Sequence, residues 1–107
     1  MTTAWTADHI GSLAPDTTSL TAASKLRGKW SGTGLRDTAL WGLCQGSGSR
    51  PYQTIVDLSG PAYKCTCPSR KFPCKHALSL LLSWSAGDVP AADTIADFAA
   101  DWLDARA

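Results

Sequence analysis

The sequence predicts an α+β fold, in which a small three-stranded antiparallel sheet precedes a buried helix and one further helix lies on each side. Two observations indicate this fold. Residues 52–58 alternate in polarity and carry β-branched side chains at their centre, which is typical of a strand. Residues 74–85 are apolar over most of their length, which is typical of a buried helix. At 107 residues the chain can bury about two-thirds of its unfolded surface in one domain.

The N-terminal part of the chain is expected to hold a flexible tail and then a helix. Residues 1–14 are polar and aperiodic, so we expect a flexible tail there and a single domain over residues 15–107. Asp16 is a suitable N-cap for a helix over about residues 17–27. Gly28 and the run Ser31-Gly32-Thr33-Gly34 then break the helix.

Three strands and a helix follow, over a core at about residues 38–86. The first two strands are predicted over residues 38–45 and 52–58, joined as a hairpin by Gly46-Ser47-Gly48-Ser49. The third strand, residues 62–66, leads into the buried helix over residues 74–85.

A last helix is predicted over about residues 89–105. Asp88 can cap it, and Pro90 suits its first turn. Its apolar side chains fall on one helical face: Ile95, Phe98, Ala99, Trp102 and Leu103. Asp93, Asp97 and Asp101 recur on the other side, where a charged stripe indicates a solvated face or a basic partner.

Cys65, Cys67, Cys74 and His76 carry the chemistry of the chain. They are spaced C-x-C, then six residues, then C-x-H. Cys65 and Cys67 share one side of a strand because they are two residues apart. Cys74 and His76 fall in the first turn of the buried helix. Three thiolates and one imidazole complete the tetrahedron that Zn²⁺ prefers, and a set without an open position makes a structural site.

Alternatives to this zinc site are buried thiols or a disulfide framework. Cys65 and Cys67 are too close in sequence to pair easily with each other. Residues 1–20 lack the basic and apolar regions of a signal peptide, so we expect a reducing, cytoplasmic setting, which favours the metal. Cys44 is interpreted as a small buried strand residue. The alternative is that Cys44 replaces His76 as the fourth zinc ligand.

The ligand spacing resembles the SWIM zinc finger, whose pattern is C-x-C, a variable gap and C-x-H. Tyr63-Lys64 and the run over residues 77–82 also resemble that family. Residues 29–84 are similar to the N-terminal region of bacterial SWIM finger proteins. The resemblance implies a ββα finger with structural zinc and a role in binding DNA or proteins within larger assemblies. The chain ends without a helix-terminating glycine, so we expect it to be the N-terminal piece of a longer protein.

Charge is distributed unevenly along the chain. Residues 25–75 contain nine basic side chains and two aspartates, a net charge of +7, whereas residues 88–107 carry a net charge of −4. Candidate phosphate contacts to DNA or RNA are therefore Arg50, Lys64, Arg70, Lys71 and Lys75. The same cations can instead offset the formal charge of −1 on a zinc ion with three thiolates.

These patterns predict a non-catalytic, zinc-dependent module that binds nucleic acid. The alternative is a protein-interaction module in which zinc is purely structural. An enzyme is not indicated, because the zinc ligands are complete and no acid–base pair is evident. No apolar run approaches the ~20 residues of a membrane span.

Overall fold

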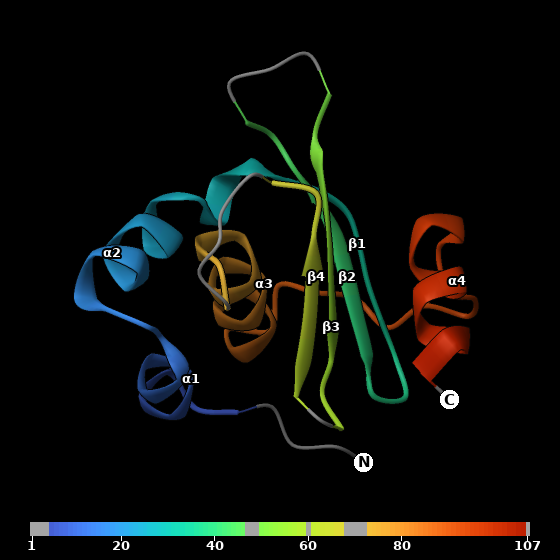
Figure 1. Ribbon diagram of the computed structural model, residues 1–107, viewed down its shortest axis with the longest axis horizontal. Coiled ribbons are helices and arrows are strands. Elements are labelled where there is room, and N and C mark those ends of the chain that lie inside the picture. Colours follow the sequence, from blue (N-terminus) through green and yellow to red (C-terminus); the bar gives the residue numbers. More distant parts are fainter. Residues whose placement is uncertain (1–4, 47–49, 60, 68–72, 107) are drawn as a thin grey trace.

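The computed structural model describes residues 5–46, 50–59, 61–67 and 73–106, which form a four-stranded antiparallel sheet, four α-helices and one short 3₁₀-helix (Figure 1). The elements are α1 (Ala7–Leu13), α2 (Thr17–Lys25), η1 (Arg27–Lys29), β1 (Trp30–Arg36), β2 (Ala39–Cys44), β3 (Tyr52–Asp57), β4 (Ala62–Cys65), α3 (Lys75–Ser85) and α4 (Asp97–Arg106). The strands lie in the order β1-β2-β3-β4. The predicted α+β class is confirmed.

The sheet has one more strand than the three that the sequence predicts. Residues 30–36, expected to be a break, pair with β2 through a register that shifts between Ser31 and Gly34. Their small and polar side chains hide the alternation on which strand prediction depends. The glycine at 34 has a packing reason, since a Cβ atom there would lie 2.5 Å from the Trp41 ring. Gly32 has φ +57°, which suits the irregularity in the strand.

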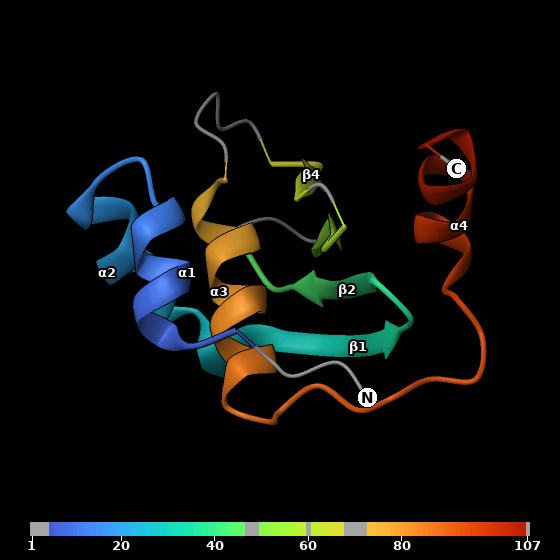
Figure 2. The same cartoon turned by 90° about the horizontal axis from the view of Figure 1, so that it is seen from below.

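The first core lies on the face of the sheet that α3 covers. Leu78, Leu80 and Leu81 of α3 are fully buried. They pack with Leu40 and Val56 of the sheet in one hydrophobic cluster. The helix is buried on nearly all sides because α1 and α2 cover it opposite the sheet, as Figure 2 shows. Trp30 joins the two layers by donating from Nε1 to the Ser79 hydroxyl at 2.9 Å.

The prediction of an irregular N-terminal tail is wrong for the residues that the structure describes there. Residues 7–13 form α1, which Thr6 caps by accepting a hydrogen bond from the His9 N–H. Ile10 is fully buried in the core cluster. The rings of Trp5 and Trp84 pack edge to face, with their centroids 5.6 Å apart. A helix of seven residues has too short an apolar pattern to be recognised, and contact with α3 is what stabilises it. The second helix follows the prediction more closely, because Asp16 caps α2 by accepting from Ser19 N at 2.7 Å.

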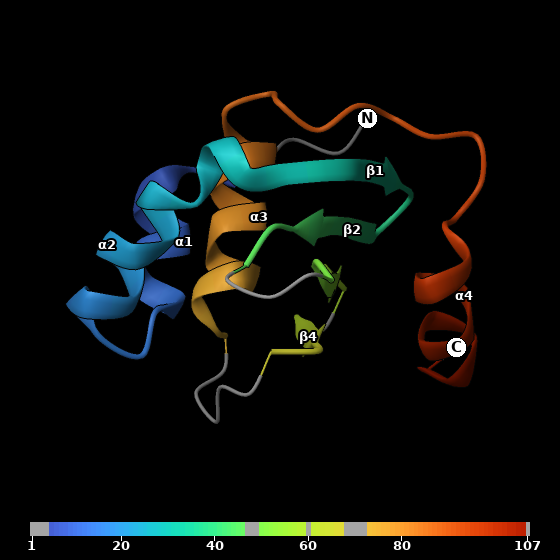
Figure 3. The ribbon, with the colours of Figure 1, turned by 90° about the horizontal axis from the view of Figure 1, so that it is seen from above.

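The C-terminal helix begins later than predicted. α4 starts at Asp97, and the preceding segment runs beside β1 (Figure 3), so Asp88 and Pro90 do not open the helix. Leu35 N donates to the Pro90 carbonyl at 3.0 Å, and Ala92 N donates to the Leu35 carbonyl at 2.9 Å. The edge of β1 offers unpaired backbone groups, and these hydrogen bonds hold the segment extended.

α4 covers the second face of the sheet and makes a smaller core there. Ala99 is fully buried against Trp41 and Ile55, and the predicted apolar face of the helix packs around them. The three aspartates Asp93, Asp97 and Asp101 are exposed. Within the described ranges, no helix has both the length and the apolar character needed to cross a membrane.

Candidate metal centre

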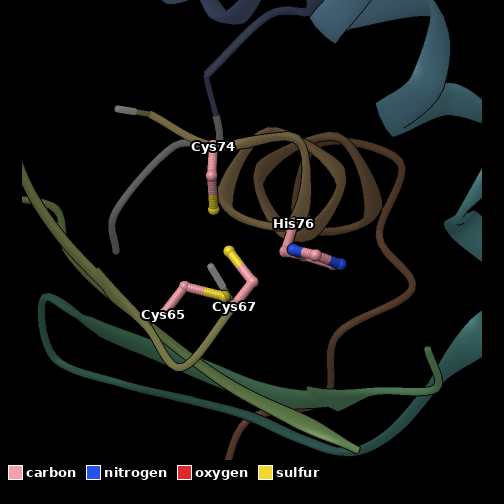
Figure 4. A group of neighbouring side chains, drawn as sticks. All are labelled: Cys65, Cys67, Cys74 and His76. Atoms are coloured by element: carbon pink, nitrogen blue, oxygen red, sulfur yellow. The ribbon is translucent and has the colours of Figure 1, made fainter. Parts of the chain in front are cut away.

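The four predicted ligands converge between the end of β4 and the start of α3. Cys65 is the last residue of β4, Cys67 lies two residues further on, Cys74 precedes α3, and His76 stands in its first turn. Figure 4 shows the three sulfur atoms directed toward one another, with the imidazole beside them. The ligand atoms all lie within 4.8 Å of one another. This cluster can hold one metal ion, and its donors are those of a structural zinc site.

The β3–β4 hairpin positions the first pair of ligands. Thr54 is opposite Cys65 in the register, and Thr66 N donates to the Gln53 carbonyl at 3.1 Å. Gln53 N in turn donates to the Thr66 hydroxyl at 2.9 Å. These contacts continue the pairing past the end of β4. They hold the backbone between the two cysteines against the sheet.

The N-terminus of α3 positions the second pair. Cys74 has an extended backbone, and its sulfur accepts a hydrogen bond from Ala77 N at 3.4 Å, so this cysteine is itself the helix N-cap. The predicted place of His76 in the first turn is confirmed, whereas Cys74 lies just before the helix as its N-cap. One residue thus has two roles, since its sulfur satisfies a helix N–H and also faces the other thiols.

A hydrogen bond between two of the thiols shifts their pKa values in opposite directions. The hydrogen bond between Cys65 and Cys74 raises the pKa of Cys65 to about 11, with burial adding to the rise. The same hydrogen bond lowers the pKa of Cys74, which the Ala77 N–H also favours, although burial opposes it. Cys74 is therefore the first of this pair to become a thiolate.

The surroundings of the cluster fit a metal ion. His76 Nδ1 is buried and has no hydrogen-bond partner among the residues described, so a metal would satisfy it. The Thr54 hydroxyl lies 3.3 Å from the Cys65 sulfur and can donate to it as a thiolate. Tyr52 packs its ring 4.8 Å from that of His76 and helps to fix the imidazole. Sequence reasoning did not identify Thr54, because its contact with Cys65 depends on the register of β3 and β4.

Loading the domain with Zn²⁺ at neutral pH is expected to release the Cys65 proton. The thiol is protonated in the metal-free domain, since its pKa is about 11, and it must be a thiolate to bind the metal. Zinc affinity should therefore increase as the pH rises. Isothermal titration in two buffers of different ionisation enthalpy measures the protons released. A buffer-independent heat would show that the thiols are already deprotonated.

A disulfide framework and a Cys44 ligand find no support in the geometry. All four are free thiols, so the structure contains no disulfide framework. Cys44 is fully buried at the end of β2, as predicted, and the metal-binding cluster includes His76 rather than Cys44. Burial, together with the nearby Cys65 sulfur, raises the pKa of Cys44 to about 11.

The candidate phosphate contacts are placed only in part. Arg50, Lys64 and Lys75 are exposed: Arg50 precedes β3, Lys64 lies next to Cys65, and Lys75 stands between Cys74 and His76. Arg70 and Lys71 lie outside the described residues. Lys75 adjoins Cys74 and His76 in the chain, whereas Lys64 adjoins Cys65 but lies on the other face of β4, because successive strand residues alternate.

Comparison with known proteins identifies the same segment. Residues 55–85 match the family model described as SWIM zinc finger. No curated protein and no solved structure matches the chain. The matched segment begins within β3 and ends with α3, and it includes all four clustered side chains. It is shorter than the resemblance over residues 29–84, because β1, β2 and the start of β3 lie outside it. The family match and the converging ligands together show that this chain contains a SWIM zinc finger, a zinc-binding module.

Proposed function

We propose that the domain is a non-catalytic module that binds nucleic acid through contacts to phosphates. The observation that carries the proposal is the exposure of Lys64 and Lys75, which adjoin Cys65 and Cys74 in the chain. A metal held by Cys65, Cys67, Cys74 and His76 would join the backbones that carry these lysines. Two cations would then have a fixed separation, which favours contact with a regular phosphate backbone.

The acidic residues lie on a different part of the molecule. Asp97, Asp101 and Asp104 are exposed on α4, across the sheet from α3 (Figure 1). The near-neutral net charge of +1 is therefore unevenly distributed, with exposed lysines adjoining the ligands in the chain and exposed aspartates on α4. Such a separation would orient the domain as it approaches a polyanion.

Phosphate contact without reading of duplex sequence is the mode that the fold supports. A helix that reads the major groove must expose polar side chains to base edges. α3 is unsuited to this, because nearly all of its residues are buried. Affinity would therefore come mostly from charge and would depend strongly on salt.

The absence of catalysis and the cellular setting are part of the proposal. A zinc ion with four protein ligands has no open position for water or substrate, so its role would be structural. Four free cysteines suit a reducing, cytoplasmic environment.

A salt titration with charge-neutralised variants tests the proposal. Zinc-loaded protein is titrated with labelled DNA and RNA, and the change of log Kobs with log salt gives the number of phosphate contacts. Lys64→Gln/Lys75→Gln should weaken binding and reduce the slope by about 2, because each lost contact removes roughly one released counterion.

The matched control is Arg36→Gln. This residue is also exposed, but it lies at the opposite end of the sheet, beside the turn between β1 and β2. The control should bind as the unmodified protein does. An equal loss of nucleic-acid affinity in both variants would indicate a general charge effect. No binding of nucleic acid at low salt would contradict the proposal.

A protein partner is the second candidate function. The exposed aspartates of α4 and the exposed lysines that adjoin the ligands in the chain could dock on complementary charged surfaces. In this case Lys64 and Lys75 would offset the charge of the zinc–thiolate centre. Neutralising these lysines would then lower the affinity for zinc, and the domain would not bind nucleic acid at any salt concentration.

A further inference from the structure

We infer that the domain binds single-stranded nucleic acid and that one unpaired nucleotide enters a cavity beside the zinc centre. This inference rests on the proposed function and adds the strandedness and the place of contact. Its basis is a cavity of about 690 Å³ that opens at the zinc end of the sheet. The zinc site does not account for this space.

Several parts of the chain enclose the cavity. Ala22 lies in α2 and Leu26 directly follows that helix, Lys29 ends η1, Gln45 follows β2, Tyr52 begins β3, and Lys75 and His76 begin α3. The volume lies within the range of about 300–1,000 Å³ of ligand pockets. No side chain of this lining is a carboxylate.

The lining matches the chemistry of a nucleotide. Apolar groups of Ala22, Leu26 and the Tyr52 ring would receive the flat base. Lys29 and Lys75 are exposed and lie on two different walls. Neither forms an ion pair with a carboxylate in the part of the chain that the structure describes. Both amines are thus available for the phosphates on either side of the base.

The wall next to the zinc centre is closely packed. The Tyr52 ring packs against His76 with centroids 4.8 Å apart, and its other contacts include Gly46, where a Cβ atom would lie 2.4 Å from the ring. Cys67 and His76 both line the cavity. A metal at these residues would therefore fix one wall, and binding in the cavity would depend on the zinc-loaded state.

A duplex cannot use this cavity without opening. Its bases are paired and stacked inside the helix, so a base must be extruded before it enters a protein pocket. A single strand exposes its bases and can insert one while its phosphates meet the lysines. Selection of single strands over duplexes of equal charge is thus the property that separates this inference from simple phosphate contact.

The experiment compares Ala22→Phe with Ser24→Phe in the zinc-loaded chain. Ala22 lines the cavity, whereas Ser24 is exposed on α2 and does not line it, so the two variants add the same side chain to one helix. Binding is measured for a labelled single strand and for a duplex of half its length, which carries the same number of phosphates. We expect the unmodified chain and Ser24→Phe to prefer the single strand by at least tenfold, and Ala22→Phe to lose that preference.

A second measurement does not depend on a folded variant. An oligonucleotide that carries a photoreactive halogenated pyrimidine is irradiated with the unmodified protein, and the crosslinked peptide is identified by mass spectrometry. A crosslink to Tyr52 supports the inference. Equal affinity for single strand and duplex, with crosslinks elsewhere, overturns it but leaves the proposed function intact. No binding to either at low salt overturns both.

Discussion

Replacing any one of the four clustered ligands is expected to abolish stoichiometric zinc binding and to unfold the region around α3. The change is Cys65→Ser, Cys67→Ser, Cys74→Ser or His76→Ala. Structural zinc can contribute on the order of 10 kcal/mol, which is comparable with the whole stability of a domain. Zinc content by mass spectrometry under native conditions and the thermal unfolding temperature check the result. A chelator should reproduce it in the unmodified protein.

Cys44→Ala is the matched control for these variants. Cys44 is as buried as the ligands but lies outside the cluster of four. The control should keep one zinc ion per chain, with only the modest cost of a smaller core side chain. One bound zinc and unchanged unfolding in all four ligand variants would contradict the assignment of the site.

Replacing Ile10 by alanine is expected to destabilise the zinc-loaded domain by about 2–5 kcal/mol, the range for large-to-small changes in a core. Ile10 is fully buried in the main cluster, although it belongs to a segment that the sequence predicts to be a flexible tail. Chemical denaturation with zinc present, followed by tryptophan fluorescence, measures the change in the free energy of unfolding.

Leu13→Ala is the control within the same helix. Leu13 is only partly buried at the edge of that cluster, so its truncation should cost less. Stability unchanged by Ile10→Ala would mean that α1 does not contribute to the core. A large effect of Ile10→Ala that exceeds Leu13→Ala would show that the first helix is part of the domain that zinc stabilises.

The metal site is the part of the protein that sequence reasoning predicted best. Its ligands are close in the chain, and their spacing depends on local geometry: two residues along the end of a strand and two residues at the first turn of a helix. The N-cap of α2 by Asp16 was likewise predictable, because a cap contacts a residue three positions away. Local rules suffice where the interacting groups are neighbours in sequence.

Several elements depend on contacts between distant residues and could not be predicted from local patterns. β1 is a strand because β2 pairs with its glycine-rich residues, and Gly34 leaves room for Trp41. The segment before α4 is extended because the backbone of Leu35 accepts and donates hydrogen bonds there. The Thr54 contact to Cys65 likewise arises only from the register of β3 and β4.

The sequence by itself thus determined the α+β class, the zinc ligands and the buried helix, since each follows from spacing or periodicity within a few residues. Only the tertiary structure decided that α1 belongs to the core, that a fourth strand completes the sheet, and that a basic cavity opens beside the ligands. The physical reason is the same in each case. Isolated short helices, glycine-rich strands and cavity walls gain their stability or shape from partners far along the chain.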